Sequence, residues 1–295
     1  MGSAMLRGRL RRALLAVAIM LISTVPSLAQ TDVNPAQASS PELHWLIPYP
    51  DADVEMHATL RLPFGKGPFP LAVVSHGTSE SEKLREDYEE PAFGVISSWL
   101  VKRGYAVLLP QRPGHGETGG RYLESSGSCD AARYQEAGYA TAEALKVAIA
   151  YAERSPIVRR GPVLLVGHSA GAWGSLALAA SEPQLVRAVV NFSGGRGGHS
   201  YGVPNRNCAP ERLVQAAAAF GAAARAKTLW LYAENDSFFG PELSRAMAEA
   251  FREAGGSVEY HLLPALPGDG HYLIFLPETV RLWGPIAEDF LKRLR

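Results

Sequence analysis

The sequence has no excess of charge of either sign, because 29 basic residues balance 29 acidic ones and the basic residues are scattered along the chain. A protein that binds nucleic acid usually gathers its basic residues into a patch or stripe, so we do not expect nucleic acid as a partner. Long apolar runs are also missing beyond the first thirty residues. We therefore expect no membrane span in the rest of the chain.

The N-terminus has the pattern of a secretory signal peptide. Four arginines among residues 7–12 precede an apolar stretch over residues 13–25, and residues 27–29 offer small side chains at the cleavage positions. We expect cleavage after Ala29 and export to the periplasm or the cell exterior; an uncleaved N-terminal anchor is the alternative. Residues 30–41 are expected to form a flexible lead-in to one domain over residues 42–295.

Cysteine is scarce, since the chain has only Cys129 and Cys208. An even number of cysteines in an exported protein predicts one disulfide, although two buried thiols would also fit the sequence. Neither cysteine has ligand-type residues at zinc spacing, and no such cluster occurs elsewhere. We therefore expect neither a metal nor another cofactor.

Short apolar segments alternate with longer amphipathic ones, which predicts strands that alternate with helices. The strands are expected at residues 43–48, 56–62, 71–75, 105–109, 163–166, 188–192, 228–233 and 258–263, and the helices at residues 91–103, 131–154, 172–180, 241–253 and 277–294. Wholly apolar strands of this kind belong to parallel sheets that helices cover on both faces. The expected fold is α/β, with about eight strands, and ligands bind where the carboxyl ends of such strands meet.

The pattern G-x-S-x-G at residues 167–171 lies between a predicted strand and a predicted helix. A nucleophile elbow needs this context, because the turn strains the serine backbone and exposes its hydroxyl. We therefore expect Ser169 to be a nucleophile, with the N-terminus of the next helix stabilising a developing oxyanion. The alternative is a glycine-rich turn with a capping serine.

A serine nucleophile needs a histidine base and a carboxylate that orients it. Asp236 follows the strand at residues 228–233, and His271 follows the last strand, so both are predicted at the edge of the sheet where Ser169 lies. Glu234 is a rival to Asp236. Asp269 is expected to be a turn residue of the histidine loop. The chemistry predicted is acyl transfer to Ser169, with water as the final acceptor.

An oxyanion hole requires two N–H donors, which we assign to Ala170 and Thr78, because Gly77 lets the second loop approach the substrate closely. Three aromatic residues that follow the candidate nucleophile, acid and base are predicted to line the substrate pocket: Trp173, Phe238 and Tyr272. Core packing is the alternative for Trp173. Arg112 and His115 are expected to brace their loop, with a direct substrate contact as the alternative for Arg112. His168 is expected to pack beside the elbow, and His199 to lie on the surface without a functional partner.

Together, several of these segments resemble the α/β-hydrolases of the dienelactone-hydrolase-like branch over residues 42–295. The resemblance depends on residues 75–77, 112–116, 167–171, 234–236 and His271. Dienelactone hydrolases proper have a cysteine nucleophile, so Ser169 makes a carboxylesterase of small or medium esters the expected activity. The resemblance also implies a small cap over residues 193–227, which a Cys129–Cys208 disulfide would tie to the rim of the cleft.

Two other functions remain compatible with the sequence. A peptidase or amidase would use the same three residues, because ester and amide hydrolysis share this chemistry. A non-catalytic binding protein of the same fold is the second alternative, although it would not need Ser169, Asp236 and His271 together. The expected partner in each enzymatic case is a small molecule or a peptide.

Overall fold

An eight-stranded sheet forms the centre of the structure, a computed structural model that describes residues 40–88 and 93–294. The predicted signal peptide and most of the predicted lead-in lie outside these residues. The strands are β1 (Glu42–Tyr49), β2 (Val54–Arg61), β3 (Leu71–Ser75), β4 (Ala106–Pro110), β5 (Val163–His168), β6 (Val186–Phe192), β7 (Lys227–Ala233) and β8 (Val258–Leu263). Their order is β1-β2-β4-β3-β5-β6-β7-β8. The pairs β1–β2 and β2–β4 are antiparallel and all others are parallel, so the predicted fold class is confirmed.

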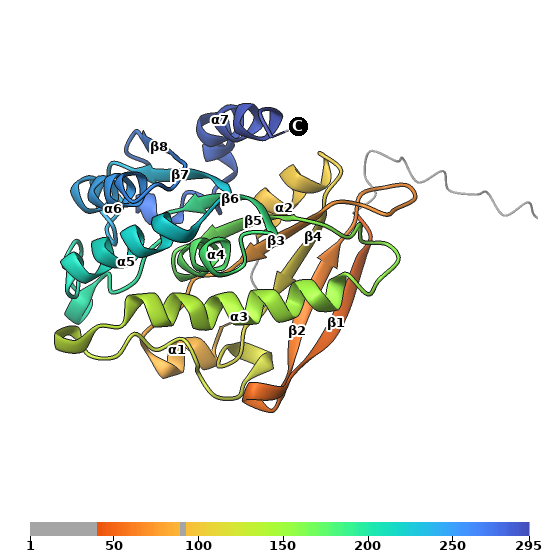
Figure 1. Cartoon of the computed structure of the whole chain (residues 1–295), viewed down its shortest axis with the longest axis horizontal. Helices are drawn as coiled ribbons and strands as arrows, with labels where there is room; N and C mark the ends of the chain where they lie inside the picture. The colour runs from red at the N-terminus through yellow and green to blue at the C-terminus, as the bar shows by residue number, and fades with distance from the viewer. Residues whose placement is uncertain (1–39, 89–92, 295) are drawn as a thin grey trace, which may run out of the picture. The chain divides into compact units, whose positions relative to one another are not determined.

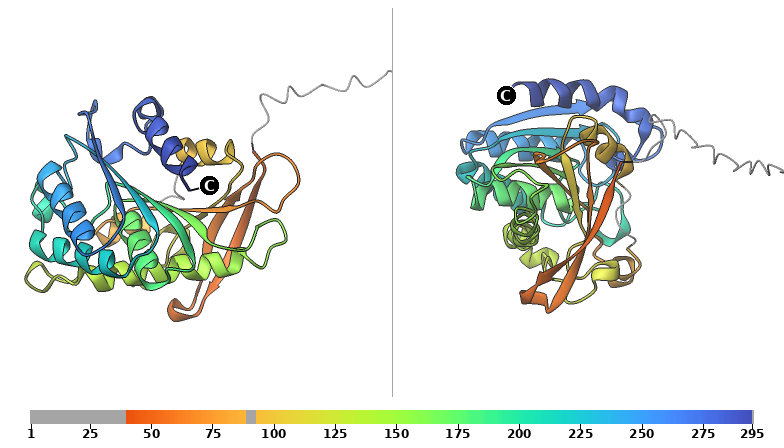
Figure 2. Two further views of the ribbon diagram at one scale, coloured as in Figure 1. Left: turned by 45° about the horizontal axis from the view of Figure 1, so that its top comes forward. Right: turned by 90° about the vertical axis from the view of Figure 1, so that its right-hand side faces the viewer.

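Helices cover both faces of this sheet (Figure 1; Figure 2). The helices α2 (Gly94–Val101) and α7 (Val280–Lys292) pack in one apolar core, and the helices α3 (Tyr134–Ala152), α4 (Ala170–Ser181), α5 (Pro210–Ala223) and α6 (Pro241–Glu253) pack in the other. Strand β5 shows why its sequence is apolar throughout. Leu164 and Val166 enter the first core and Leu165 enters the second, because successive side chains point to opposite faces.

Some predicted helix boundaries are wrong by a few residues. Helix α3 begins at Tyr134 because Cys129–Ala131 form a separate 3-10 turn, and α7 begins at Val280 because Pro277–Thr279 form another. Helix α1 (Glu82–Glu86) was not predicted at all. It has only five residues, too few for apolar periodicity to reveal.

The segment between β6 and β7 is small, as the sequence predicts. It consists of α5 and the preceding residues 193–209, which we call the cap loop. A disulfide joins Cys208 of this loop to Cys129, with their Cα atoms 5.0 Å apart. The Tyr134 hydroxyl also donates to the Cys208 carbonyl, and the Cys208 N–H donates to the Gly197 carbonyl at 2.8 Å. The disulfide and the Tyr134 hydrogen bond attach the cap loop to the start of α3, and the bond to Gly197 lies within the loop itself.

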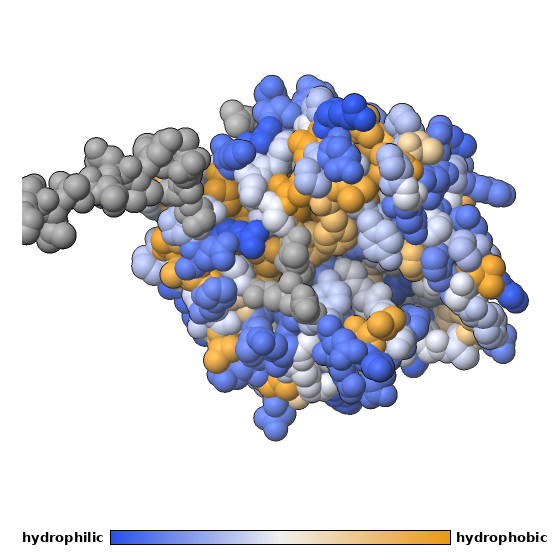
Figure 3. Space-filling view, turned by 180° about the vertical axis from the view of Figure 1, so that it is seen from behind, coloured by the Kyte–Doolittle hydropathy of each residue, from blue (hydrophilic) through white to orange (hydrophobic). Residues whose placement is uncertain are grey.

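One face of the molecule is mainly polar. Figure 3 shows one face, where hydrophilic residues predominate and hydrophobic ones gather in the upper half of the view. Among residues 40–88 and 93–294, no helix has both the length and the apolar composition that crossing a bilayer requires.

Candidate active site

Ser169 lies in the tight turn between β5 and α4, with φ 52° and ψ −122°. A non-glycine residue with this backbone is strained, and such strain is typical of functional sites. The turn holds because the Ser169 N–H donates to the Phe192 carbonyl at 3.0 Å and the Gly195 N–H donates to the Ser169 carbonyl at 3.3 Å. A Cβ atom at Gly171 would collide with the backbone of β3. The elbow therefore has the geometry that its sequence predicts.

His271 and Asp236 form a buried pair on the loops that follow β8 and β7. Nδ1 of His271 lies 3.1 Å from Oδ1 and 3.3 Å from Oδ2 of Asp236. Oδ1 also accepts the N–H groups of Phe238 and Phe239, each at 2.9 Å. Burial alone would raise the pKa of Asp236, but the hydrogen bond and charge of His271 and the amide donors outweigh it and lower that pKa. The carboxylate therefore stays ionised beside the imidazole.

Glu234, the rival acid, does not share this site. Its side chain is exposed and lines a different cavity, with Glu242 and Asn205. Asp236 lies two residues further from the strand, where the chain has turned toward His271. The structure therefore pairs His271 with the acid that the sequence favours.

The histidine loop is tied directly to the elbow. His168, the residue before Ser169, donates from Nε2 to the carbonyl of His271 at 2.9 Å, and the two ring centroids are 4.8 Å apart. His168 is fully enclosed; burial and then the nearby His271 lower its pKa to about 3, so the ring is neutral. This hydrogen bond fixes the position of His271 relative to the turn that carries Ser169.

Asp269 stabilises the same loop, as expected for a turn residue. Its Oδ1 accepts the His271 N–H at 2.9 Å and the Ser237 N–H at 3.1 Å, while its Oδ2 accepts the Ser237 hydroxyl at 2.5 Å. The loop of the candidate acid and the loop of the candidate base are thus joined by one carboxylate.

A stack of three rings, formed by His199, Phe238 and His271, connects the cap loop to the candidate base, and sequence reasoning missed it. Phe238 stacks on His271 with centroids 4.1 Å apart, and His199 stacks on the other face of Phe238 at 3.6 Å and 7°. The Ser237 hydroxyl donates its single hydrogen to Asp269, so it accepts the His199 Nε2–H at 2.7 Å. His199 was expected to be a surface residue without a partner, and that expectation is wrong. No local sequence pattern links His199 to Phe238 and His271, which lie 39 and 72 residues further along the chain.

The expected pocket residues differ in their surroundings. Trp173 is fully buried, donates from Nε1 to the Tyr134 carbonyl at 2.8 Å and packs on Phe220, so it belongs to the core and not to the substrate pocket. Tyr272 is 45% exposed beside His271 and remains available to a ligand. Phe238 contacts the imidazole itself.

The predicted oxyanion donors lie on two segments that meet at the elbow. A Cβ atom placed on Gly77 would be 3.3 Å from Cβ of Ser169, so the loop after β3 runs directly over the elbow. Thr78 follows, and its N–H has no partner among the described residues. Ala170 is the first residue of α4, where an N–H has no acceptor within the helix.

The Thr78 side chain is held by His115. Nδ1 of His115 donates to the carbonyls of Arg112 and Pro113, so Nε2 accepts the Thr78 hydroxyl at 2.7 Å. Burial lowers the pKa of His115 to about 4, which keeps this acceptor unprotonated at neutral pH.

A buried network of charged residues connects the loop after β3, the segment after β4 and the cap loop. Arg112 donates to Glu124, to the Ser75 hydroxyl at 3.0 Å and to the His76 carbonyl at 2.9 Å. Arg196 of the cap loop donates to the same carboxylate at 2.7 Å. Burial opposes the charge of Glu124, but the two arginines hold its pKa well below the usual range. Arg112 therefore braces its loop, as expected, and the role of Arg196 was not predicted.

Residues that could bind a metal do not gather at this site. Within the described ranges, no group of three or more histidine, cysteine, aspartate or glutamate side chains is arranged to hold a metal ion.

Comparison with known proteins identifies the family. The model described as "Alpha/beta hydrolase family" matches residues 72–291. The esterase Pf2001 of Pyrococcus furiosus has a similar structure, with a TM-score of 0.63 and 16% identity over 88% of this chain and 95% of that chain. Est1E of Butyrivibrio proteoclasticus, solved with ferulic acid, has a TM-score of 0.59 and 16% identity over 84% and 98%. A predicted dienelactone hydrolase of Klebsiella pneumoniae has a TM-score of 0.58 and 16% identity over 85% and 98%. No curated protein matches the sequence significantly.

Proposed function

Because the chain belongs to the alpha/beta hydrolase family, we propose that it is an exported serine esterase that hydrolyses small to medium carboxylic esters. The observation that carries this proposal is the buried Asp236–His271 pair, which a hydrogen bond from His168 ties to the strained turn of Ser169. Its structural neighbours include esterases, and that similarity supports the same class of reaction.

In the first half-reaction, the Ser169 hydroxyl attacks the ester carbonyl carbon while Nε2 of His271 takes its proton. Asp236 accepts the Nδ1–H of His271, which fixes the tautomer and stabilises the imidazolium. The N–H groups of Ala170 and Thr78 donate to the oxyanion. The imidazolium then gives its proton to the departing alcohol, which leaves an acyl group on Ser169.

In the second half-reaction, His271 removes a proton from water as the water attacks the acyl carbon. The tetrahedral intermediate collapses, the carboxylic acid leaves and the proton returns to Ser169. Asp236 stays ionised throughout, in agreement with its lowered pKa.

Two features support the substrate size and the location. The cap is a short loop with one helix, which favours an open cleft beside Tyr272 instead of a deep tunnel. The Cys129–Cys208 disulfide agrees with the oxidising compartment that the signal-like N-terminus predicts.

The test is a series of p-nitrophenyl esters, from acetate to dodecanoate, on purified protein. We expect Ser169→Ala to lower kcat by about 10⁴-fold or more, and Ser181→Ala, an exposed serine on the same helix, to leave it unchanged. Hydrolysis of p-nitroanilides but not of esters would indicate an amidase. Failure of the folded protein to hydrolyse either series would favour a binding protein and contradict the proposal.

A further inference from the structure

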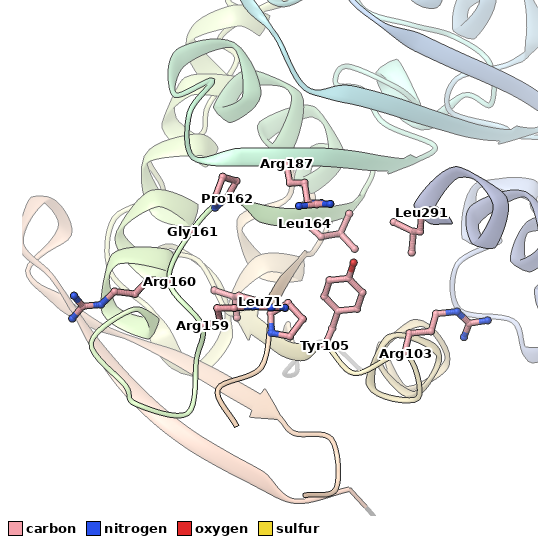
Figure 4. Close-up of a pocket in the computed structure, with 11 residues that line it drawn as sticks. Leu71, Arg103, Tyr105, Arg159, Arg160, Gly161, Pro162, Leu164, Arg187 and Leu291 are labelled. Atoms are coloured by element: carbon pink, nitrogen blue, oxygen red, sulfur yellow. The ribbon is translucent and has the colours of Figure 1, made fainter. Parts of the chain in front are cut away.

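A cavity of about 510 Å³ lies at the edge of the sheet opposite the candidate active site (Figure 4). Leu71, Leu164 and Arg187 line it, and each is the first or second residue of its strand. Ser169 and Asp236, in contrast, follow the carboxyl ends of β5 and β7. The six residues of β5 place the two edges roughly 20 Å apart. The cavity is therefore separate from the candidate active site and has a volume typical of small-molecule sites.

Four arginines surround this cavity, and three of them lack a carboxylate partner among the described residues. Arg103 is paired with Glu288 at 2.5 Å. Arg187 donates to the Leu294 carbonyl, and Arg160 donates to the Glu153 carbonyl at 3.2 Å; both acceptors are neutral. The Arg159 backbone N–H donates to the Phe69 carbonyl at 2.7 Å, but its guanidinium has no hydrogen-bond partner in the described part of the chain. Figure 4 shows the Arg160 side chain pointing away from the cavity, so among the described residues the unbalanced positive charge that faces the cavity comes from Arg159 and Arg187.

The interior of the cavity combines a polar and an apolar wall. Figure 4 shows the Tyr105 hydroxyl pointing inward, close to Arg187, with Leu164 and Leu291 beside it. This hydroxyl has no hydrogen-bond partner among residues 40–88 and 93–294. A buried or half-buried hydroxyl usually has one, so its orientation leaves a donor available to a ligand.

From this arrangement we propose that the cavity binds an organic phosphate, with its phosphate group at Arg159, Arg187 and Tyr105 and its organic part against Leu164 and Leu291. Guanidinium groups match phosphate oxygens in a bidentate geometry. Two unbalanced charges are more than one carboxylate would balance, whereas a phosphate monoester carries nearly two negative charges at neutral pH. The same chemistry is found in free phosphate esters and in the phosphate headgroups of lipids.

The test of the free ligand is calorimetric titration of the protein with phenyl phosphate. We expect saturable binding that weakens with added salt, because exposed charges are screened. The double variant Arg159→Gln/Arg187→Gln should bind at least about tenfold more weakly, and Tyr105→Phe should weaken binding less. Arg252→Gln is the matched control, since Arg252 is an exposed arginine of α6 outside the cavity. Ester hydrolysis should be the same in all four proteins, because the cavity is remote from Ser169.

Cosedimentation with vesicles that contain phosphatidic acid distinguishes the two sources. Binding to vesicles that the double variant loses and Arg252→Gln retains would assign the site to a lipid phosphate. Binding of phenyl phosphate without cosedimentation would assign it to a soluble phosphate ester. The proposal is overturned if neither probe binds, or if the double variant and the control bind both probes equally well.

Discussion

His199 of the cap loop supports the imidazole of His271 indirectly, through Phe238, and replacing His199 by alanine removes that support. The substitution deletes the His199–Phe238 stack at 3.6 Å and the hydrogen bond to Ser237 at 2.7 Å. Phe238 then loses the ring that presses it against His271, and Ser237 loses a donor beside Asp269. Both effects should loosen the position of the His271 ring, although neither removes a group that would take part in proton transfer.

The two lost contacts set the size of the effect. A ring stack contributes about 0.5–1.5 kcal/mol, and a hydrogen bond contributes a net amount of about 0.5–1.5 kcal/mol. If both contributions serve to hold the base in the transition state, kcat falls by roughly 5- to 150-fold. KM should change little, because His199 contacts neither Ser169 nor the predicted oxyanion donors in the structure.

Two further variants separate the contributions. His199→Phe retains the stack and loses the hydrogen bond, whereas Ser237→Ala keeps the ring contact and loses both the hydrogen bond from His199 and the hydroxyl that donates to Asp269. In p-nitrophenyl acetate assays over a range of pH, we expect His199→Phe to lower kcat less than His199→Ala does, and Ser237→Ala to show the combined loss of the two hydrogen bonds. An alanine variant with unchanged kcat and an unchanged pH profile would refute the positioning role. So would a change confined to KM.

Three further predictions concern stability, each measured by urea denaturation. Replacing both Cys129 and Cys208 by alanine should cost about 2–4 kcal/mol, because the disulfide closes a loop across 79 positions; no loss would mean that the link is not formed in the folded protein. Glu124→Gln should cost about 3–5 kcal/mol, because it leaves two buried arginines without their carboxylate, and a cost below that of an exposed pair would contradict this. The protein should lose stability as the pH falls below 6.5 toward 4, because buried His168 and His115 stay neutral in the folded protein, with pKa values of about 3 and about 4, while the unfolded chain takes up protons. His115→Gln should reduce that slope by up to about 1.4 kcal/mol per pH unit, and an unchanged slope would count against it.

The parts of the fold that were predictable from sequence are those that local chemistry determines. A strand such as β5 is apolar at nearly every position because both of its faces are buried, and a continuous apolar segment of this kind can be recognised in the sequence. The elbow was readable for a similar reason, since its glycines allow backbones to approach where a side chain would collide. The choice of Asp236 over Glu234 needed only the position of each residue relative to the end of β7.

The parts that were not predictable depend on contacts between distant positions. The position of Trp173 four residues after the nucleophile does not show whether its side chain faces a ligand or the core. Its contact with Phe220 of α5, a residue distant in sequence, places it in the core. His199 stacks on Phe238 because the cap loop returns over the loop that carries Asp236, and Arg196 shares Glu124 with Arg112 because the cap loop also contacts the segment after β4. The path of a glycine-rich loop leaves no periodic signal in the sequence.

Whether Ser169 is a nucleophile activated by His271 can be tested by labelling the protein with a fluorophosphonate, followed by peptide mass spectrometry. We expect one covalent adduct, on the peptide that contains Ser169. That adduct should be absent in Ser169→Ala, strongly slowed in His271→Ala and unaffected in Ser181→Ala. Reaction of the folded protein at another residue, or no adduct while the Asp236–His271 pair is intact, would show that Ser169 is not the nucleophile.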